Sequence, residues 1–153
     1  MAQILLITTL LSIAGLIATS IGGFIATPGH VANHILLALV TVVLGLFSQS
    51  MTMFFFIGTG KQVKDKVKGG ADESEVRQAT RSLAMRVSPI ATYAMVALMV
   101  TFIMGGGVAS GKTPRWLHLS LSAATVLLYA RAYWVEIQAM EANDRLMERF
   151  LKE

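Results

Sequence analysis

The stretch ILLITTLLSIAGLIATSIGGFIA, residues 4–26, decides the class of this protein. It carries no charged side chain, and the first Lys, Arg, Asp or Glu of the whole sequence is Lys61. A helix needs about 20 mainly apolar residues to cross the hydrocarbon core of a bilayer. No basic segment precedes this stretch, as one would in a secretory signal peptide. We therefore predict that residues 4–26 form a transmembrane helix that the protein retains.

The composition of the whole chain supports the same prediction. Hydrophobic residues make up 54% of the 153 residues, and charged residues only 14%, against about 25% in a typical soluble domain. A soluble fold of this length could not bury so much apolar surface, so we expect a lipid bilayer as the partner of this surface. Three further segments are long and apolar enough to cross it: residues 35–58, 87–109 and 116–135. The last is the weakest, because Arg131 lies inside it.

These four segments predict an all-α integral membrane protein, with four transmembrane helices in an up-down bundle. A single-chain membrane barrel would instead show short segments of alternating hydrophobicity. The chain is also too short for two domains of usual size, so we expect one domain, residues 1–153.

The positive charges predict the orientation of this bundle. Seven of the thirteen Lys and Arg residues lie between Lys61 and Arg86, and loops rich in Lys and Arg stay in the cytoplasm. Both termini would then be cytoplasmic, and we expect the inner membrane of a bacterium. Residues 61–86 are predicted to form a helical hairpin that is broken at glycines 69 and 70. With the C-terminal helix 137–153, this hairpin would extend the second, third and fourth helices into the cytoplasm.

Three histidines are the strongest candidates for a site. The predicted topology places His30, His34 and His118 at one level near the outer boundary of the membrane. Neutral imidazole binds haem iron, copper and zinc, and helix bundles commonly build cofactor sites from facing helices. We predict a b-type haem between His34 and His118, with Met99 against the macrocycle and Arg131 near its propionates. The alternatives are a copper or zinc ion on all three histidines, or no cofactor at all.

A second polar level lies toward the cytoplasmic side. A stripe at helical spacing marks the inner face of the fourth helix: His118, Ser122, Thr125, Tyr129 and Glu136. Arg131 and Glu136 are five residues apart, on different sides of the helix, and are a poor pair. Each would find a partner elsewhere, such as Gln49, Tyr93 or another subunit. Our simplest expectation is that Arg131 reaches the lipid head groups and that Glu136 is already in water.

Several function classes are excluded or left without support. The chain has no cysteine and therefore no thiolate metal site or cysteine nucleophile. It shows no basic face with base-reading residues for a nucleic acid. The acids and the histidines fall at opposite ends, so no self-contained catalytic site is predicted, and enzyme activity stays uncertain.

Two functions remain. The first is a membrane subunit that carries a haem or metal and serves electron transfer in a membrane complex. The second is a non-catalytic accessory subunit that packs against other membrane subunits, or against its own copy, through stripes of small residues. In that role its cytoplasmic helices would dock a soluble partner.

Overall fold

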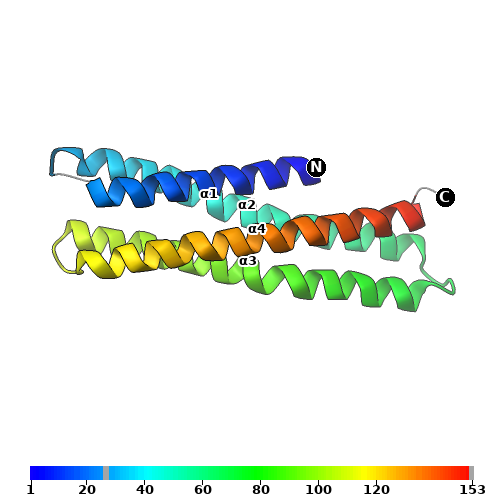
Figure 1. Cartoon of the computed structure of the whole chain (residues 1–153). Helices are drawn as coiled ribbons and strands as arrows, with labels where there is room; N and C mark the ends of the chain where they lie inside the picture. The colour runs from blue at the N-terminus through cyan, green and yellow to red at the C-terminus, as the bar shows by residue number, and fades with distance from the viewer. Residues whose placement is uncertain (26–27, 152–153) are drawn as a thin grey trace.

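Four long helices make up the computed structural model, which describes residues 1–25 and 28–151. They are α1 (Ala2–Ile25), α2 (Val31–Lys66), α3 (Glu73–Ala109) and α4 (Arg115–Leu151), with a short 3-10 helix, η1 (Pro28–His30), before α2. The helices lie side by side, with η1 and the α3–α4 turn at one end of the bundle and the α2–α3 turn at the other (Figure 1). The predicted all-α class and the four-helix bundle are confirmed.

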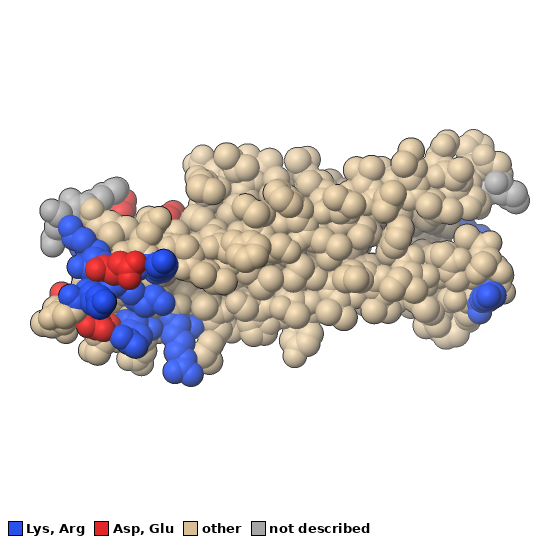
Figure 2. Space-filling view, turned by 180° about the vertical axis from the view of Figure 1, so that it is seen from behind, with Lys and Arg blue, Asp and Glu red and all other residues tan. Residues whose placement is uncertain are grey.

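Three of the four helices are long and apolar enough to cross a membrane: α1, α2 and α3. The helix α4 is not among these three, and its apolar stretch contains His118 and Arg131. Large apolar side chains cover the outside of the bundle, among them Leu11, Phe47, Ile103 and Leu127. The charged side chains visible in Figure 2 gather mainly at one end of the molecule, and the length between the ends is almost free of charge. This surface suggests a lipid environment.

Helices α2, α3 and α4 extend beyond the first residue of α1. They have 36, 37 and 37 residues against 24 in α1, which corresponds to about 55 Å against about 36 Å at 1.5 Å per residue. The three-helix extension has its own small core of Val63, Val76 and Phe150. Within this extension α2 ends at Lys66, α3 begins at Glu73 and α4 ends at Leu151. Residue 26 of the first predicted span and residues 152–153 of the last helix lie outside the described residues.

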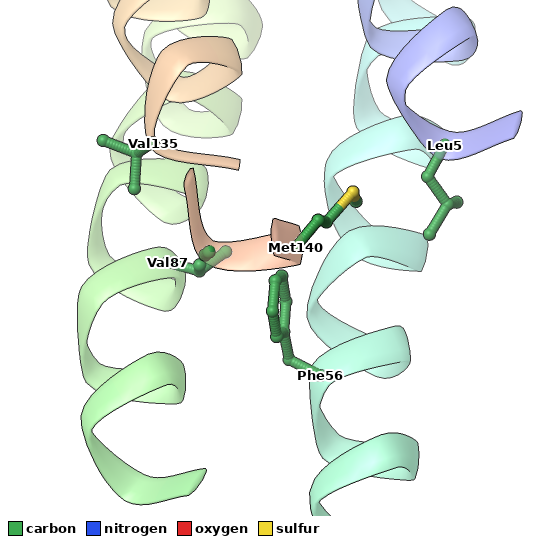
Figure 3. Packing of buried hydrophobic residues seen from close by; sticks show 6 residues of the cluster. Leu5, Phe56, Val87, Val135 and Met140 are labelled. Atoms are coloured by element: carbon green, nitrogen blue, oxygen red, sulfur yellow. The ribbon is translucent and has the colours of Figure 1, made fainter. Parts of the chain in front are cut away.

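A larger apolar cluster joins the extension to the rest of the bundle. It comprises Leu5, Phe56, Val87, Val135, Ala139 and Met140, which come from all four helices. Phe56 reaches from α2 toward Met140 and Val87 (Figure 3). Because each helix contributes to this cluster, the packing fixes the register of α1 against the three longer helices.

The α2–α3 turn is built around one glycine and one glutamate. Gly69 has φ 76°, in the left-handed region that glycine adopts without a steric penalty, so the predicted break is confirmed. The Gly69 N–H donates a hydrogen bond to Oε2 of Glu73 (2.8 Å), and Arg77 donates one to Oε1 (2.8 Å). These two bonds hold the pKa of Glu73, which lies well outside the apolar segments, below its usual value.

We expect Glu73→Gln to lower the thermal stability of the protein at neutral pH and to make little difference at acidic pH. Because the pKa of Glu73 is lower in the folded state, its ionised carboxylate stabilises the protein at pH values above the unfolded-state pKa. That contribution disappears as pH falls through the folded-state pKa. Thermal unfolding of the purified protein at both pH values measures this. Asp72→Asn is the control, because Asp72 makes no side-chain capping bond. A stability loss that is equal at both pH values would contradict the explanation.

A glycine in the middle of α2 allows α3 and α4 to approach. A Cβ at Gly45 would lie 2.8 Å from Cδ2 of Leu98 and 2.9 Å from the hydroxyl oxygen of Tyr129. Small residues at such contacts are the usual means by which helices pack closely in membranes. Gly58, further along the same helix, would meet nothing within 4 Å.

Gly45→Val should therefore destabilise the bundle by about 1–3 kcal/mol, the usual cost of overpacking. Gly58→Val is a matched control, because it introduces the same β-branched residue into the same helix at an open position. Thermal unfolding in one detergent compares the two variants. Equal melting temperatures would show that the close approach at Gly45 does not limit stability.

Candidate functional site: a cavity between two histidines

A cavity of about 580 Å³ lies between the four helices near the end that holds η1 and the α3–α4 turn. Its volume falls within the range of small-molecule and cofactor sites, about 300–1,000 Å³. Most of its walls are apolar, with Leu16 from α1, Val42 from α2 and Phe102 from α3. Such a cavity suits an apolar ligand with a few polar attachment points.

His34 of α2 and His118 of α4 both line this cavity. They are close enough for a charge on one ring to act on the other. The Nδ1 atoms of both rings are buried, and neither has a hydrogen-bond partner among the residues described. Buried polar atoms are normally paired, so the two unpaired nitrogens set these residues apart from the other polar groups that line the cavity.

Glycines on the neighbouring helices make room for the two rings. A Cβ at Gly105 of α3 would lie 3.0 Å from Cε1 of His118, and a Cβ at Gly22 of α1 would lie 3.4 Å from Nδ1 of His34. The first distance is tighter than ordinary van der Waals contact. A side chain at position 105 would thus displace the His118 ring.

Arg115 places a positive charge on the wall of the cavity. Its guanidinium donates hydrogen bonds to the backbone carbonyl oxygens of Gly23 (2.7 Å) and Phe24 (2.6 Å). These are among the last carbonyls of α1, which have no partner within their own helix. The contact ties α4 to α1 and offers a counter-charge to an acidic group on a ligand.

The other predicted site residues lie outside the cavity. His30 is exposed in η1, and Met99 is 49% exposed on α3. Arg131 is exposed on α4, about four helical turns beyond Arg115. No three His, Asp or Glu side chains in the described part of the chain are placed to hold one metal ion. The geometry thus brings His34 and His118 together, and leaves His30, Met99 and Arg131 apart from them.

Glu136 forms a second polar centre, deeper in the bundle. Its side chain is 0% exposed. Oε1 accepts a hydrogen bond from Nε2 of Gln49 (2.7 Å), and Oε2 accepts one from Oγ1 of Thr9 (3.0 Å). The expectation that Glu136 is already in water was wrong, while Gln49 is the partner that the sequence suggested. The stripe that Glu136 shares with Tyr129 faces the bundle interior, and this outweighs its position at the end of the apolar segment.

Two features of the site were missed from the sequence. The contacts of Arg115 were not predicted, and small residues were expected only to pack against other subunits. The position of the glycines could have indicated their role beside the rings. Gly22, Gly23 and Gly105 lie at the same end of the bundle as His34 and His118. Nothing in the sequence pointed to the backbone carbonyls that Arg115 contacts, because they belong to a helix about 90 residues away.

Comparison of the chain with protein-family models, curated proteins and solved structures gives no match. The function proposed below therefore rests on the geometry of the site.

Proposed function

We propose that this protein is a membrane subunit that binds a b-type haem between His34 and His118 and serves electron transfer in a membrane complex. One observation carries the proposal. Two imidazoles from separate helices share an apolar cavity of about 580 Å³, and each has a buried ring nitrogen without a partner among the described residues. Paired histidines on facing helices are a common way to hold a cofactor in a bundle.

The residues around the cavity fit such a group. His34 and His118 would bind the iron, and Arg115 would face the acidic substituents of the macrocycle. Leu98 and Phe102 would contact its apolar surface and exclude water from it. The bound haem would supply one-electron transfer, at a potential set by the residues that hold it and by the polarity of its pocket.

The proposal places all four helices across the plasma membrane of a bacterium, with both termini in the cytoplasm. Seven of thirteen basic residues lie in the segment 61–86, which the positive-inside rule assigns to the cytoplasm. The histidine cavity then lies toward the outer surface. Arg115 is the main exception on that side, and its bonds to the carbonyls of α1 offset its charge.

The orientation can be tested by cysteine labelling, since the native chain has no cysteine. Ser110→Cys and Ala71→Cys introduce one thiol each, at exposed positions in the α3–α4 and α2–α3 turns. We expect a membrane-impermeant maleimide to label only the first variant in intact spheroplasts and both variants after lysis. Labelling of only the second in intact spheroplasts would show the opposite orientation.

The haem can be tested by a reduced-minus-oxidised absorption spectrum of the purified protein. We expect a Soret band in the difference spectrum, and we expect its amplitude to fall about tenfold or more in His34→Ala and in His118→Ala. Removal of a metal ligand commonly costs at least this factor in affinity. His30→Ala and Met99→Ala are the controls and should keep the spectrum, because both residues lie outside the cavity.

The same variants distinguish haem from a bare ion. Copper or zinc bound by all three histidines would be lost in His30→Ala as well, and would be found by metal analysis of a preparation without a Soret band. A preparation that contains neither haem nor metal, and that gains no spectrum when haem is added, would contradict the cofactor proposal.

The second candidate function is a non-catalytic accessory subunit. It is favoured by the extension of α2, α3 and α4 beyond α1, which presents an exposed, charged surface that includes Arg77, Arg145 and Arg149. A soluble partner could dock there without any cofactor in the bundle. Co-purification of a colourless, metal-free protein with other membrane subunits would support this role.

A further inference from the structure

A buried carboxyl group without a positive partner stands in the centre of the bundle. Glu136 and the three side chains that surround it from α1 and α2 are all 0% exposed: Thr9, Ser48 and Gln49. In the described part of the chain, the ion pairs join exposed residues of the three-helix extension, and none of them includes Glu136. Its surroundings therefore contribute hydrogen bonds and no compensating charge.

Each helix that packs against this carboxyl presents neutral groups to it. On α1 and α2 these are Thr9, Ser48 and Gln49. On α3 the buried residues near this level are apolar, such as Ala91 and Ala94. On α4 itself, the phenol of Tyr129 is the titratable group close enough to act on Glu136. A carboxylate that is buried without a counter-charge is costly, and such a group normally becomes neutral by binding a proton.

A chain of hydroxyl groups leads away from the carboxyl. Thr9 Oγ1 and Ser48 Oγ are 2.6 Å apart, and either atom can be the donor. Thr8 Oγ1 donates to the carbonyl oxygen of Leu5 at 2.8 Å and lies 3.4 Å from Ser48 Oγ, and Thr8 is only half-buried. Because each hydroxyl both donates and accepts, the direction of the Glu136–Thr9–Ser48 bonds can reverse as a whole.

Three more buried polar atoms have no hydrogen-bond partner within residues 1–25 and 28–151. They are Oε1 of Gln49, Oγ1 of Thr52 and the hydroxyl of Tyr129. Gln49 already contacts Glu136, and Thr52 lies one turn along the same helix from Ser48. Water bound to such atoms would add to the polar surroundings of the carboxyl.

We propose that Glu136 is a proton-exchanging site in the core of the bundle. When the carboxyl holds its proton, the contact between Oε2 and Oγ1 of Thr9 reverses, and the carboxyl is then the donor. In exchange, the O–H bond of the carboxyl breaks, and the hydroxyls of Thr9 and Ser48 each take up one proton and release their own. The released proton goes to water that enters beside Thr8 from the end of the bundle where α1 begins. The carboxylate that remains accepts hydrogen bonds from Thr9 and from Nε2 of Gln49. This site shares no residue with the histidine cavity, so it does not depend on a haem.

The test is modification with dicyclohexylcarbodiimide, an apolar reagent that adds to protonated carboxyl groups in apolar surroundings. The carboxyl proton moves to a nitrogen of the reagent, and the carboxyl oxygen bonds to its central carbon, with no redox change. We expect peptide mass mapping of the reconstituted full chain to find the adduct on Glu136. Its rate should fall about tenfold per pH unit once the group ionises.

The chain offers a matched internal control. Glu141 lies five residues further along the same helix and is exposed, with its carboxylate paired to Arg145 at 2.8 Å. It should stay unmodified under the same conditions. Glu136→Gln should abolish the adduct. Peptide mapping of the wild-type protein identifies the modified residue by itself, so the test holds even if this variant does not fold.

Two more variants test the hydrogen bonds. Gln49→Leu and Thr9→Val each remove a donor to the ionised carboxylate, so modification of Glu136 should persist to higher pH than in the wild type. Ser50→Ala is their control, since Ser50 donates to the sulfur of Met95 rather than to this network. An unmodified Glu136 or a rate independent of pH would overturn the proposal. Protection by sodium but not by potassium would also overturn it, in favour of a metal-cation site.

Discussion

Hydrogen bonding between side chains inside an apolar exterior is the constraint on which the rest of the structure depends. Where helices present apolar residues outward, each polar group that faces inward must form its hydrogen bonds within the bundle, because no solvent water reaches it there. Some hydroxyls bond back to their own helix, as Thr101 does to the carbonyl of Ala97 (2.7 Å). Others pair across helices, as Ser20 does with Ser122 (2.6 Å) and Thr101 with Thr125 (2.7 Å). These pairs join α1 and α3 to α4 at defined positions and so set the register in which the helices pack.

The same constraint applies to both polar centres, but only Glu136 meets it with hydrogen bonds inside the bundle. Glu136 satisfies both carboxyl oxygens inside the bundle, so its chemistry is internal and concerns the proton that it holds. His34 and His118 both line a cavity, and each leaves one buried ring nitrogen without a partner among the residues described, which is why we propose a ligand from outside the chain at this place. An apolar cluster that includes Leu98 and Tyr129 lies between these levels. Leu98 also lines the cavity, so this cluster packs directly against the histidine site.

Much of the architecture could be predicted from local patterns. Apolar length predicted the helices, and Gly69 predicted the break between α2 and α3. The stripe on α4 that ends at Glu136 also predicted an inward face, yet the position of this residue beyond the apolar segment argued for water. The structure resolves the conflict because α1 and α2 cover this side chain, and Thr9 and Gln49 bond to its two carboxyl oxygens. Met99 and Arg131 were assigned to the cofactor by residue type and depth alone, and neither of these determines the direction in which a side chain points.

The sequence by itself determined that the chain forms long helices with apolar exteriors and which faces carry the polar residues, because both properties follow from hydropathy and the helical period. It also determined where the charges concentrate. Only the tertiary structure decided that the rings of His34 and His118 share one cavity with Arg115, and that Glu136 meets Gln49 and Thr9. These contacts join residues up to 127 positions apart. They depend on the rotation and register of one helix against another, which the close packing at glycines and the hydroxyl pairs settle together.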